Sequence, residues 1–142
     1  MIRVLVCCGG GFSSSFMSKN VNKGIKDKGY EGYITCDFLP FGESKIHEDD
    51  YDVIMCCPHL RYKLEERIKQ NNSKIPYYVI PAKMYGQMAI EDVYQEAKDI
   101  IEGYKKDPSN NPFKFPGEEN NVSMRLHCYK KDILKLPLDE LK

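Results

Sequence analysis

The chain has 142 residues, which is enough for one domain with a hydrophobic core. Lysine plus arginine equals aspartate plus glutamate, at 21 residues each, so no net field attracts nucleic acid to the protein. No apolar run reaches the roughly 18 residues of a membrane span and no signal peptide is recognisable, so we expect a cytoplasmic protein that does not insert into membranes.

The first predicted unit is a strand, a glycine turn and a helix. Residues 2–6 are apolar and β-branched apart from Arg3, a pattern that predicts a strand. The three glycines at 9–11 let a bound group approach the backbone closely, and the three serines at 13–15 are residues that open helices. Free N–H groups and the positive end of the helix dipole then favour a bound anion such as phosphate.

Two cysteines, Cys7 and Cys8, end this strand at the mouth of the expected anion site. A thiol near a helix N-terminus has its thiolate favoured, which makes it a better nucleophile. The alternative is a buried structural cysteine, because free cysteine is among the most buried residue types. A dinucleotide site is disfavoured because Ser14 stands where its third glycine belongs, and no lysine follows the glycines as a Walker loop requires. A thiolate in a phosphate cradle predicts chemistry in which phosphate is carried on sulfur.

The cysteines of the chain do not form a metal-binding or disulfide pattern. The six cysteines include two adjacent pairs and no C-x-x-C motif. A reducing compartment is the setting that suits free thiols in this number. We therefore expect no metal and no cofactor.

The rest of the chain alternates predicted strands with predicted helices. The first helix is expected to run from Ser13 or Ser14 to Lys28, with Gly29 as its stop. Such alternation indicates an α/β fold with a parallel sheet and helices on both faces. Further strands are expected at residues 30–39, 51–57 and 75–80, a helical turn at 43–50, and helices at 60–71 and 90–104.

The composition changes after the last of these helices. Residues 105–121 are polar and rich in proline and asparagine, which is typical of a linker. Residues 122–142 regain apolar character, and the alternation from Val122 to Cys128 favours a half-buried strand docked on the domain. A segment that binds a partner protein is the alternative.

Three motifs together resemble one family, the enzyme IIB component of the bacterial phosphoenolpyruvate-dependent sugar phosphotransferase system, lactose/cellobiose type. The family's C-x-x-G-[MF]-S-[ST]-S at the head of a helix matches residues 8–15, a register that makes Cys8 the phosphocysteine and Cys7 a strand residue. Residues 52–62 resemble its strand ending in P-Q-[IV]-x-[YF], with His59 where glutamine is usual. Residues 80–88 resemble its I-x-x-x-x-Y-G-x-M.

The resemblance implies a four-stranded parallel sheet of order 2-1-3-4, similar to the fold of low-molecular-weight tyrosine phosphatases. It implies a IIB domain over residues 1–104, which leaves residues 105–121 as a linker and 122–142 as a C-terminal extension of unknown role. Sites in such sheets form at the carboxyl ends of the strands, where the strand order reverses. The expected phosphate cradle comprises Gly9, Gly10, Gly11, Phe12, Ser13, Ser14 and Ser15, and its expected neighbours are Pro58, His59, Arg61 and Tyr85.

The function implied by the resemblance is a phosphoryl relay. A phosphohistidine on a IIA protein gives its phosphoryl group to Cys8, which passes it to a sugar held by the membrane protein IIC. The chain is then cytoplasmic and associates with the membrane only through IIC. Cellobiose, lactose and chitobiose are all compatible sugars, because the sugar pocket belongs to IIC.

Two other functions remain open on the sequence. A phosphatase of the same fold uses Cys-x5-Arg, but here the position six residues after Cys8 is Ser14. A non-catalytic IIB homologue that regulates or docks is the other alternative, suggested by His59 and by the extension.

Overall fold

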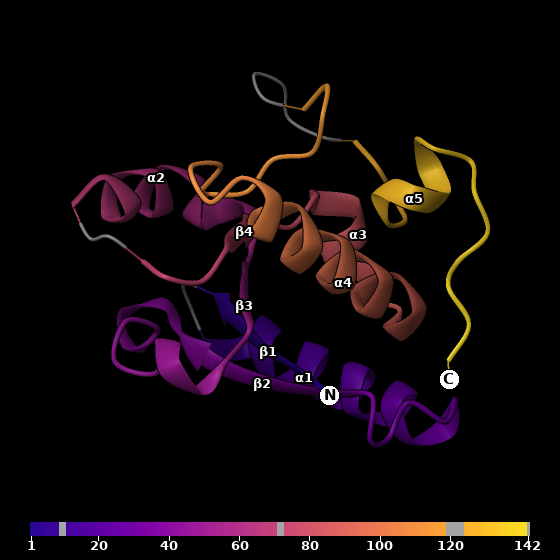
Figure 1. Cartoon of the computed structure of the whole chain (residues 1–142). Coiled ribbons are helices and arrows are strands. Elements are labelled where there is room, and N and C mark those ends of the chain that lie inside the picture. The colour runs from indigo at the N-terminus through magenta and orange to yellow at the C-terminus, as the bar shows by residue number, and fades with distance from the viewer. Residues whose placement is uncertain (9–10, 71–72, 119–123, 142) are drawn as a thin grey trace.

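The computed structural model describes residues 1–8, 11–70, 73–118 and 124–141, with backbone only for Cys8 and for residues 11–17. Figure 1 shows the arrangement of its helices and strands. The strands are β1 Ile2–Cys8, β2 Ile34–Pro40, β3 Val53–Cys56 and β4 Tyr77–Val79. The α-helices are α1 Gly11–Asp27, α2 Arg61–Gln70, α3 Ala82–Gln87, α4 Ile90–Lys106 and α5 Tyr129–Asp132. Short 3-10 helices are η1 Phe41–Glu43, η2 Glu48–Asp50 and η3 Pro58–Leu60.

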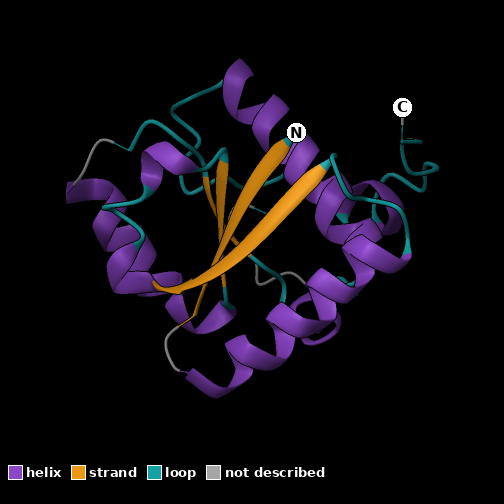
Figure 2. Ribbon diagram, turned by 90° about the horizontal axis from the view of Figure 1, so that it is seen from below, coloured by secondary structure: helices purple, strands orange, loops and turns teal. Residues whose placement is uncertain are grey.

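The four strands form one parallel sheet in the order β2-β1-β3-β4, as predicted. Because β2 and β3 pair with opposite edges of β1, the strand order reverses between β1 and β3. Figure 2 shows the helices on both sides of this twisted sheet. The predicted fold class is therefore confirmed.

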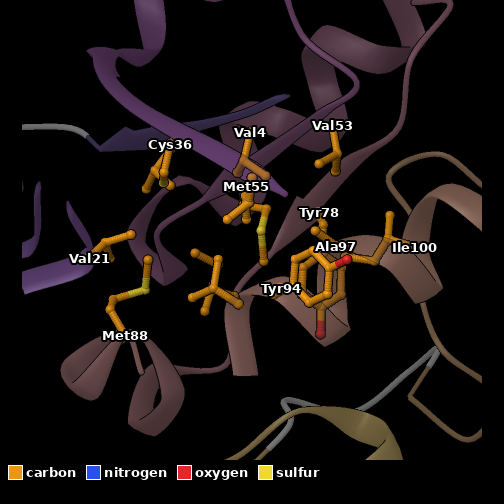
Figure 3. Close-up of a cluster of buried hydrophobic side chains, with 14 of the residues drawn as sticks. Val4, Val21, Cys36, Val53, Met55, Tyr78, Met88, Tyr94, Ala97 and Ile100 are labelled. Carbon is orange, nitrogen blue, oxygen red and sulfur yellow. The ribbon is translucent and has the colours of Figure 1, made fainter. Parts of the chain in front are cut away.

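Alternate residues of the strands supply two separate hydrophobic cores. On one face, Val4, Val53 and Met55 pack with residues of α1 and α4, and Figure 3 shows part of this core. On the other face, Leu5 and Ile54 pack against Leu64 of α2 and its neighbours. The side-chain period of two along each strand explains this division, and buried strands of this kind need a helical layer on each face.

Three predicted boundaries differ from the observed ones. Helix α1 begins at Gly11 rather than at Ser13 or Ser14, so the three serines lie inside its first turns instead of capping it. Strand β2 begins at Ile34, because Gly29 and Gly32 adopt positive φ angles and form turns before it. The segment after β4, predicted as a loop, contains helix α3.

The edge strand β4 is covered by the segment that follows α4. The Phe113 N–H donates to the Tyr77 carbonyl at 2.7 Å, and the Asn111 side chain accepts from the Tyr77 N–H at 2.9 Å. The Asn111 amide also donates to the Ile75 carbonyl at 3.1 Å. These bonds satisfy backbone groups that an open sheet edge would expose. The division of the chain at residue 104 stays a prediction, but the described part of the predicted linker is packed against the sheet.

The extension docks on α4 through a buried ionic group, which we call the Arg125 cluster: Arg125, Glu96, Glu118 and Tyr78. Arg125 contacts Glu96 at 3.1 Å and Glu118 at 2.7 Å, and it donates to the Tyr78 hydroxyl at 2.7 Å. The Tyr129 N–H donates to Glu96 at 2.8 Å. Figure 1 shows α5 beside α4. Docking of the extension is thus observed, but residues 124–128 form no strand, and Ile133, Leu134 and Leu136 are about half exposed.

A matched pair of glycine substitutions tests how the segment that follows α4, which covers β4, packs against α4. A Cβ at Gly103 would lie 2.7 Å from ring carbons of Phe113, whereas a Cβ at Gly86 would meet no atom within 4 Å. Both substitutions gain helix propensity of up to about 1 kcal/mol, but only Gly103→Ala overpacks a buried contact, at about 1–3 kcal/mol. We expect Gly103→Ala to have an unfolding free energy about 1–3 kcal/mol below that of Gly86→Ala. Equal values in chemical denaturation would mean that Phe113 does not pack on α4.

The buried carboxyl of Glu96 predicts a pH dependence of stability. Burial raises its pKa from 4.5 to about 7, against the opposing effects of Arg125 and the Tyr129 N–H. The folded state therefore keeps this proton at pH values where the unfolded chain has lost it, so this contribution to stability falls as pH rises from 4.5 to about 7. Denaturation across this range should show the fall, and Glu96→Gln should flatten it. An unchanged slope in Glu96→Gln would assign the dependence to other groups.

Candidate functional site

The backbone at the end of β1 lies where the strand order reverses. Cys8 pairs with Pro40 of β2, while Cys7 pairs with Cys56 of β3. The Cys57 N–H donates to the Cys7 carbonyl at 3.0 Å, so the chain leaving β3 runs beside the end of β1. Gly9 and Gly10 of the expected cradle lie outside the described residues. The carboxyl edge between β1 and β3 is thus the candidate site.

Helix α1 begins three residues after Cys8 and runs for 17 residues. Its first N–H groups have no partner within the helix, and the helix dipole adds partial positive charge at that end. No acidic residue occupies its first turn, so no carboxylate competes there with an anion. The side chains of Phe12, Ser13, Ser14 and Ser15 lie outside the described side chains, so hydroxyl contacts to phosphate stay a prediction.

The cysteines other than Cys8 are buried. Cys7, Cys36, Cys56, Cys57 and Cys128 all lie in the interior. Burial raises the pKa of Cys56 well above its ordinary value, and a hydrogen bond with Cys7 adds to this shift. Burial likewise raises the pKa of Cys36, and it raises that of Cys128 to about 12. Thiols in such surroundings are poor nucleophiles, because the thiolate is the reactive form.

Three of the predicted neighbours meet at one place. Pro58 opens η3 directly after Cys57, His59 is exposed on it, and Arg61 begins α2. All three line one cavity at the carboxyl ends of β3 and β4. The Arg61 guanidinium lies 3.8 Å from Glu65 one turn along α2, which is a loose pairing.

Tyr85, the fourth predicted neighbour, occupies a different position. It lies in α3, is partly buried and packs against both hydrophobic cores. Tyr85 is not among the residues that line the cavity with Pro58. Its burial indicates a packing role, and a contact with phosphate stays a prediction.

Acidic residues that could assist catalysis lie elsewhere. Glu48, Asp49 and Asp50 form η2 just before β3, whose first residue Val53 pairs with Val4 near the start of β1. The η2 carboxylates therefore lie toward the amino ends of the strands, away from Cys8. Within the described part of the chain, no group of three or more His, Cys, Asp or Glu side chains could hold a metal ion.

Some residues that complete the cavity beside Pro58 were not predicted from the sequence. Pro112, Phe113 and Lys114 form part of its wall, although they belong to the predicted linker. The signal was the pair of phenylalanines at 113 and 115, since large apolar residues are unusual in a solvated linker.

Comparison with known proteins identifies the family. The family model described as "PTS system, Lactose/Cellobiose specific IIB subunit" matches residues 3–96. The chain belongs to this IIB family. It is therefore a phosphotransferase component of a sugar transport system, in which IIB subunits work with IIA and IIC components.

One solved structure similar to this IIB chain is the lactose-specific IIB component domain of the phosphoenolpyruvate:carbohydrate phosphotransferase system from Streptococcus pneumoniae. It has 19% sequence identity and a TM-score of 0.42, and the match covers 74% of this chain and 95% of that one. A search of curated proteins finds no match. In the described ranges of the IIB chain, no helix is long and apolar enough to cross a membrane.

Proposed function

We propose that this IIB protein carries a phosphoryl group on Cys8, from a IIA phosphohistidine to a sugar of the cellobiose, lactose or chitobiose class bound by IIC. The observation that carries the proposal is the position of Cys8 in the fold of this member of the IIB family. Cys8 ends β1 where the strand order reverses, and a 17-residue helix begins three residues later. Helix N-termini at such positions bind phosphate and favour thiolates.

In the first step, the Cys8 thiolate attacks the phosphorus in line with the P–N bond of the phosphohistidine. The S–P bond forms as the P–N bond breaks, and the imidazole of IIA leaves with the electron pair. Backbone N–H groups at the start of α1 stabilise the negative charge on the equatorial oxygens. In the second step, a sugar hydroxyl oxygen attacks phosphorus, the S–P bond breaks and Cys8 leaves as a thiolate. The hydroxyl proton passes to a base in the IIC complex.

The burial of Cys7 argues against that neighbour of Cys8 as the carrier. Cys7 is fully buried and packs with Leu5 and Cys56 in the core on the α2 face. A nucleophile there would have to leave the core before it met a donor. The motif register and the burial of Cys7 therefore agree on Cys8.

A carrier of this kind should hydrolyse its phosphocysteine slowly. A phosphatase stabilises the transition state with an arginine that grips phosphate in two places. Ser14 stands at that position here, and the η2 carboxylates lie toward the other end of the sheet. We therefore expect no useful turnover of p-nitrophenyl phosphate, and a phosphoprotein that persists for minutes without a sugar acceptor.

The experiment is an absorbance assay for p-nitrophenol, run beside a decay measurement on the isolated phosphoprotein. Cys8→Ser is the matched variant, since it replaces the sulfur with an oxygen and changes nothing else. Background release that is equal in both proteins supports the carrier. Steady hydrolysis by the wild type that Cys8→Ser abolishes would favour the phosphatase.

A further inference from the structure

Helix α1 carries a row of lysines on the side turned away from the core. Lys19, Lys23 and Lys26 are all exposed. At 3.6 residues per turn, these three positions fall within an arc of about 60° around the helix axis. Val21 and Ile25 pack in the hydrophobic core and lie on the opposite side of the helix. We call the three exposed residues the α1 lysine stripe.

The charge of this stripe is not neutralised within the described part of the chain. No lysine of the stripe forms an ion pair with a described carboxylate, whereas Lys28, just after the helix, pairs with Glu91 at 2.5 Å. The acidic residues nearest in sequence, Asp27 and Glu31, lie at the last residue of α1 and beyond it. Three lysines and one aspartate leave α1 with two net positive charges. The outward face of α1 therefore favours an anionic partner.

The side chains of this face suit a broad anionic surface better than a specific protein partner. All the cations of α1 are lysines, which are point charges on flexible stems. Interfaces between proteins are depleted in lysine and enriched in arginine and aromatic residues. Between residues 18 and 27 no apolar side chain is exposed, so this face has nothing to insert into hydrocarbon. Clustered lysines of this kind are attracted to the anionic headgroups of a lipid bilayer.

We propose that the α1 lysine stripe binds the surface of an anionic lipid bilayer. The three ammonium groups lie among the headgroup phosphates, and α1 stays outside the hydrocarbon. The stripe begins about 12 Å along the helix axis from Gly11, at 1.5 Å per residue, and Cys8 precedes Gly11 by three residues. Cys8 therefore lies near one end of the helix that carries the bound face. Binding brings the phosphocysteine to the membrane that holds IIC; only this last consequence rests on the proposed function.

The test is co-sedimentation of the full-length protein with vesicles of phosphatidylglycerol mixed with phosphatidylcholine, and with vesicles of phosphatidylcholine alone. We expect binding to the anionic vesicles only, and binding that weakens as salt shortens the Debye length from about 30 Å at 0.01 M to about 10 Å at 0.1 M. Changing Lys19, Lys23 and Lys26 together to glutamine should weaken binding about a hundred-fold, at roughly five-fold per lysine. Asp27→Asn removes the acid of the helix and should strengthen binding several-fold.

A matched triple variant separates the stripe from the net charge of the protein. Lys69, Lys83 and Lys106 are exposed on three different helices, and changing them to glutamine removes the same total charge. This control should bind the anionic vesicles nearly as well as the wild type. Equal losses in the two triple variants, equal binding to both kinds of vesicle, or no binding to anionic vesicles at low salt would overturn the proposal.

The vesicle measurement is independent of the phosphoryl relay, because it needs neither IIA nor IIC. A protein that binds anionic vesicles through the stripe but accepts no phosphoryl group would refute the proposed function and support this inference. Binding to isolated IIA that the stripe variant loses, with no binding to vesicles, would place a protein on the stripe instead and overturn the inference.

Discussion

Cys8→Ser is expected to take up no phosphoryl group from phosphorylated IIA, while Cys7→Ala takes up as much as the wild type. The two residues are neighbours in one strand, but Cys8 is the last residue of β1, three positions before α1 begins. Cys7 is fully buried, and alanine keeps that position apolar. Measurement of the incorporated label after denaturing electrophoresis gives the result directly.

The linkage chemistry provides the control for this experiment. A label carried on sulfur and one carried on histidine differ in how their release depends on acid and alkali, which separates Cys8 from any phosphohistidine. Both variants must unfold cooperatively in denaturant, so that loss of label is not loss of fold. Label retained by a folded Cys8→Ser, or lost from a folded Cys7→Ala, would mean that the motif register is wrong.

Above pH 7, where Glu96 is ionised, Arg125→Met is expected to lower the unfolding free energy by about 3–5 kcal/mol, because it leaves the Glu96 carboxylate buried without its cationic partner. Arg125 and Glu96 are 4% and 0% exposed. The matched control is Arg3→Met, which removes an exposed pair with Asp52 of similar length, 3.0 Å. That change should cost far less, because an exposed ion pair contributes little to stability.

A double variant separates two causes of the lost stability in Arg125→Met: the unpaired buried charge of Glu96 and the lost contacts of the Arg125 side chain. Adding Glu96→Gln to Arg125→Met removes the uncompensated carboxylate, so it should restore part of the lost stability. Chemical denaturation of the four proteins completes the cycle. A loss in Arg125→Met no larger than that in Arg3→Met would show that the extension is not anchored by this cluster.

The sheet could be predicted well from the sequence, because each strand is marked by residues that are close together along the chain. Short apolar runs such as residues 2–6 and 51–57 mark buried strands, and the alternation with helices limits the topology to few choices. The family motifs then supplied the strand order and the place of Cys8. Their register also agrees with the observed burial of Cys7.

What the sequence could not predict depends on contacts between distant residues. Asn111 is a linker residue by composition, but its amide bonds the backbone of Tyr77 and Ile75. An arginine such as Arg125 is expected at the surface. Arg125 is buried because it pairs with Glu96, which lies 29 residues away along the chain. Ile133 and Leu134 belong to the C-terminal segment whose role the sequence left open between docking and partner binding, and both are about half exposed.

The most direct test of the carrier function is a chase of the labelled protein. Wild-type protein phosphorylated on Cys8 is mixed with membranes that contain its IIC partner and with cellobiose, lactose or chitobiose in turn, and the label is followed. A carrier transfers its label to one of these sugars in equal molar amount, with little free phosphate. Label that appears as inorganic phosphate at the same rate with and without sugar would contradict the account.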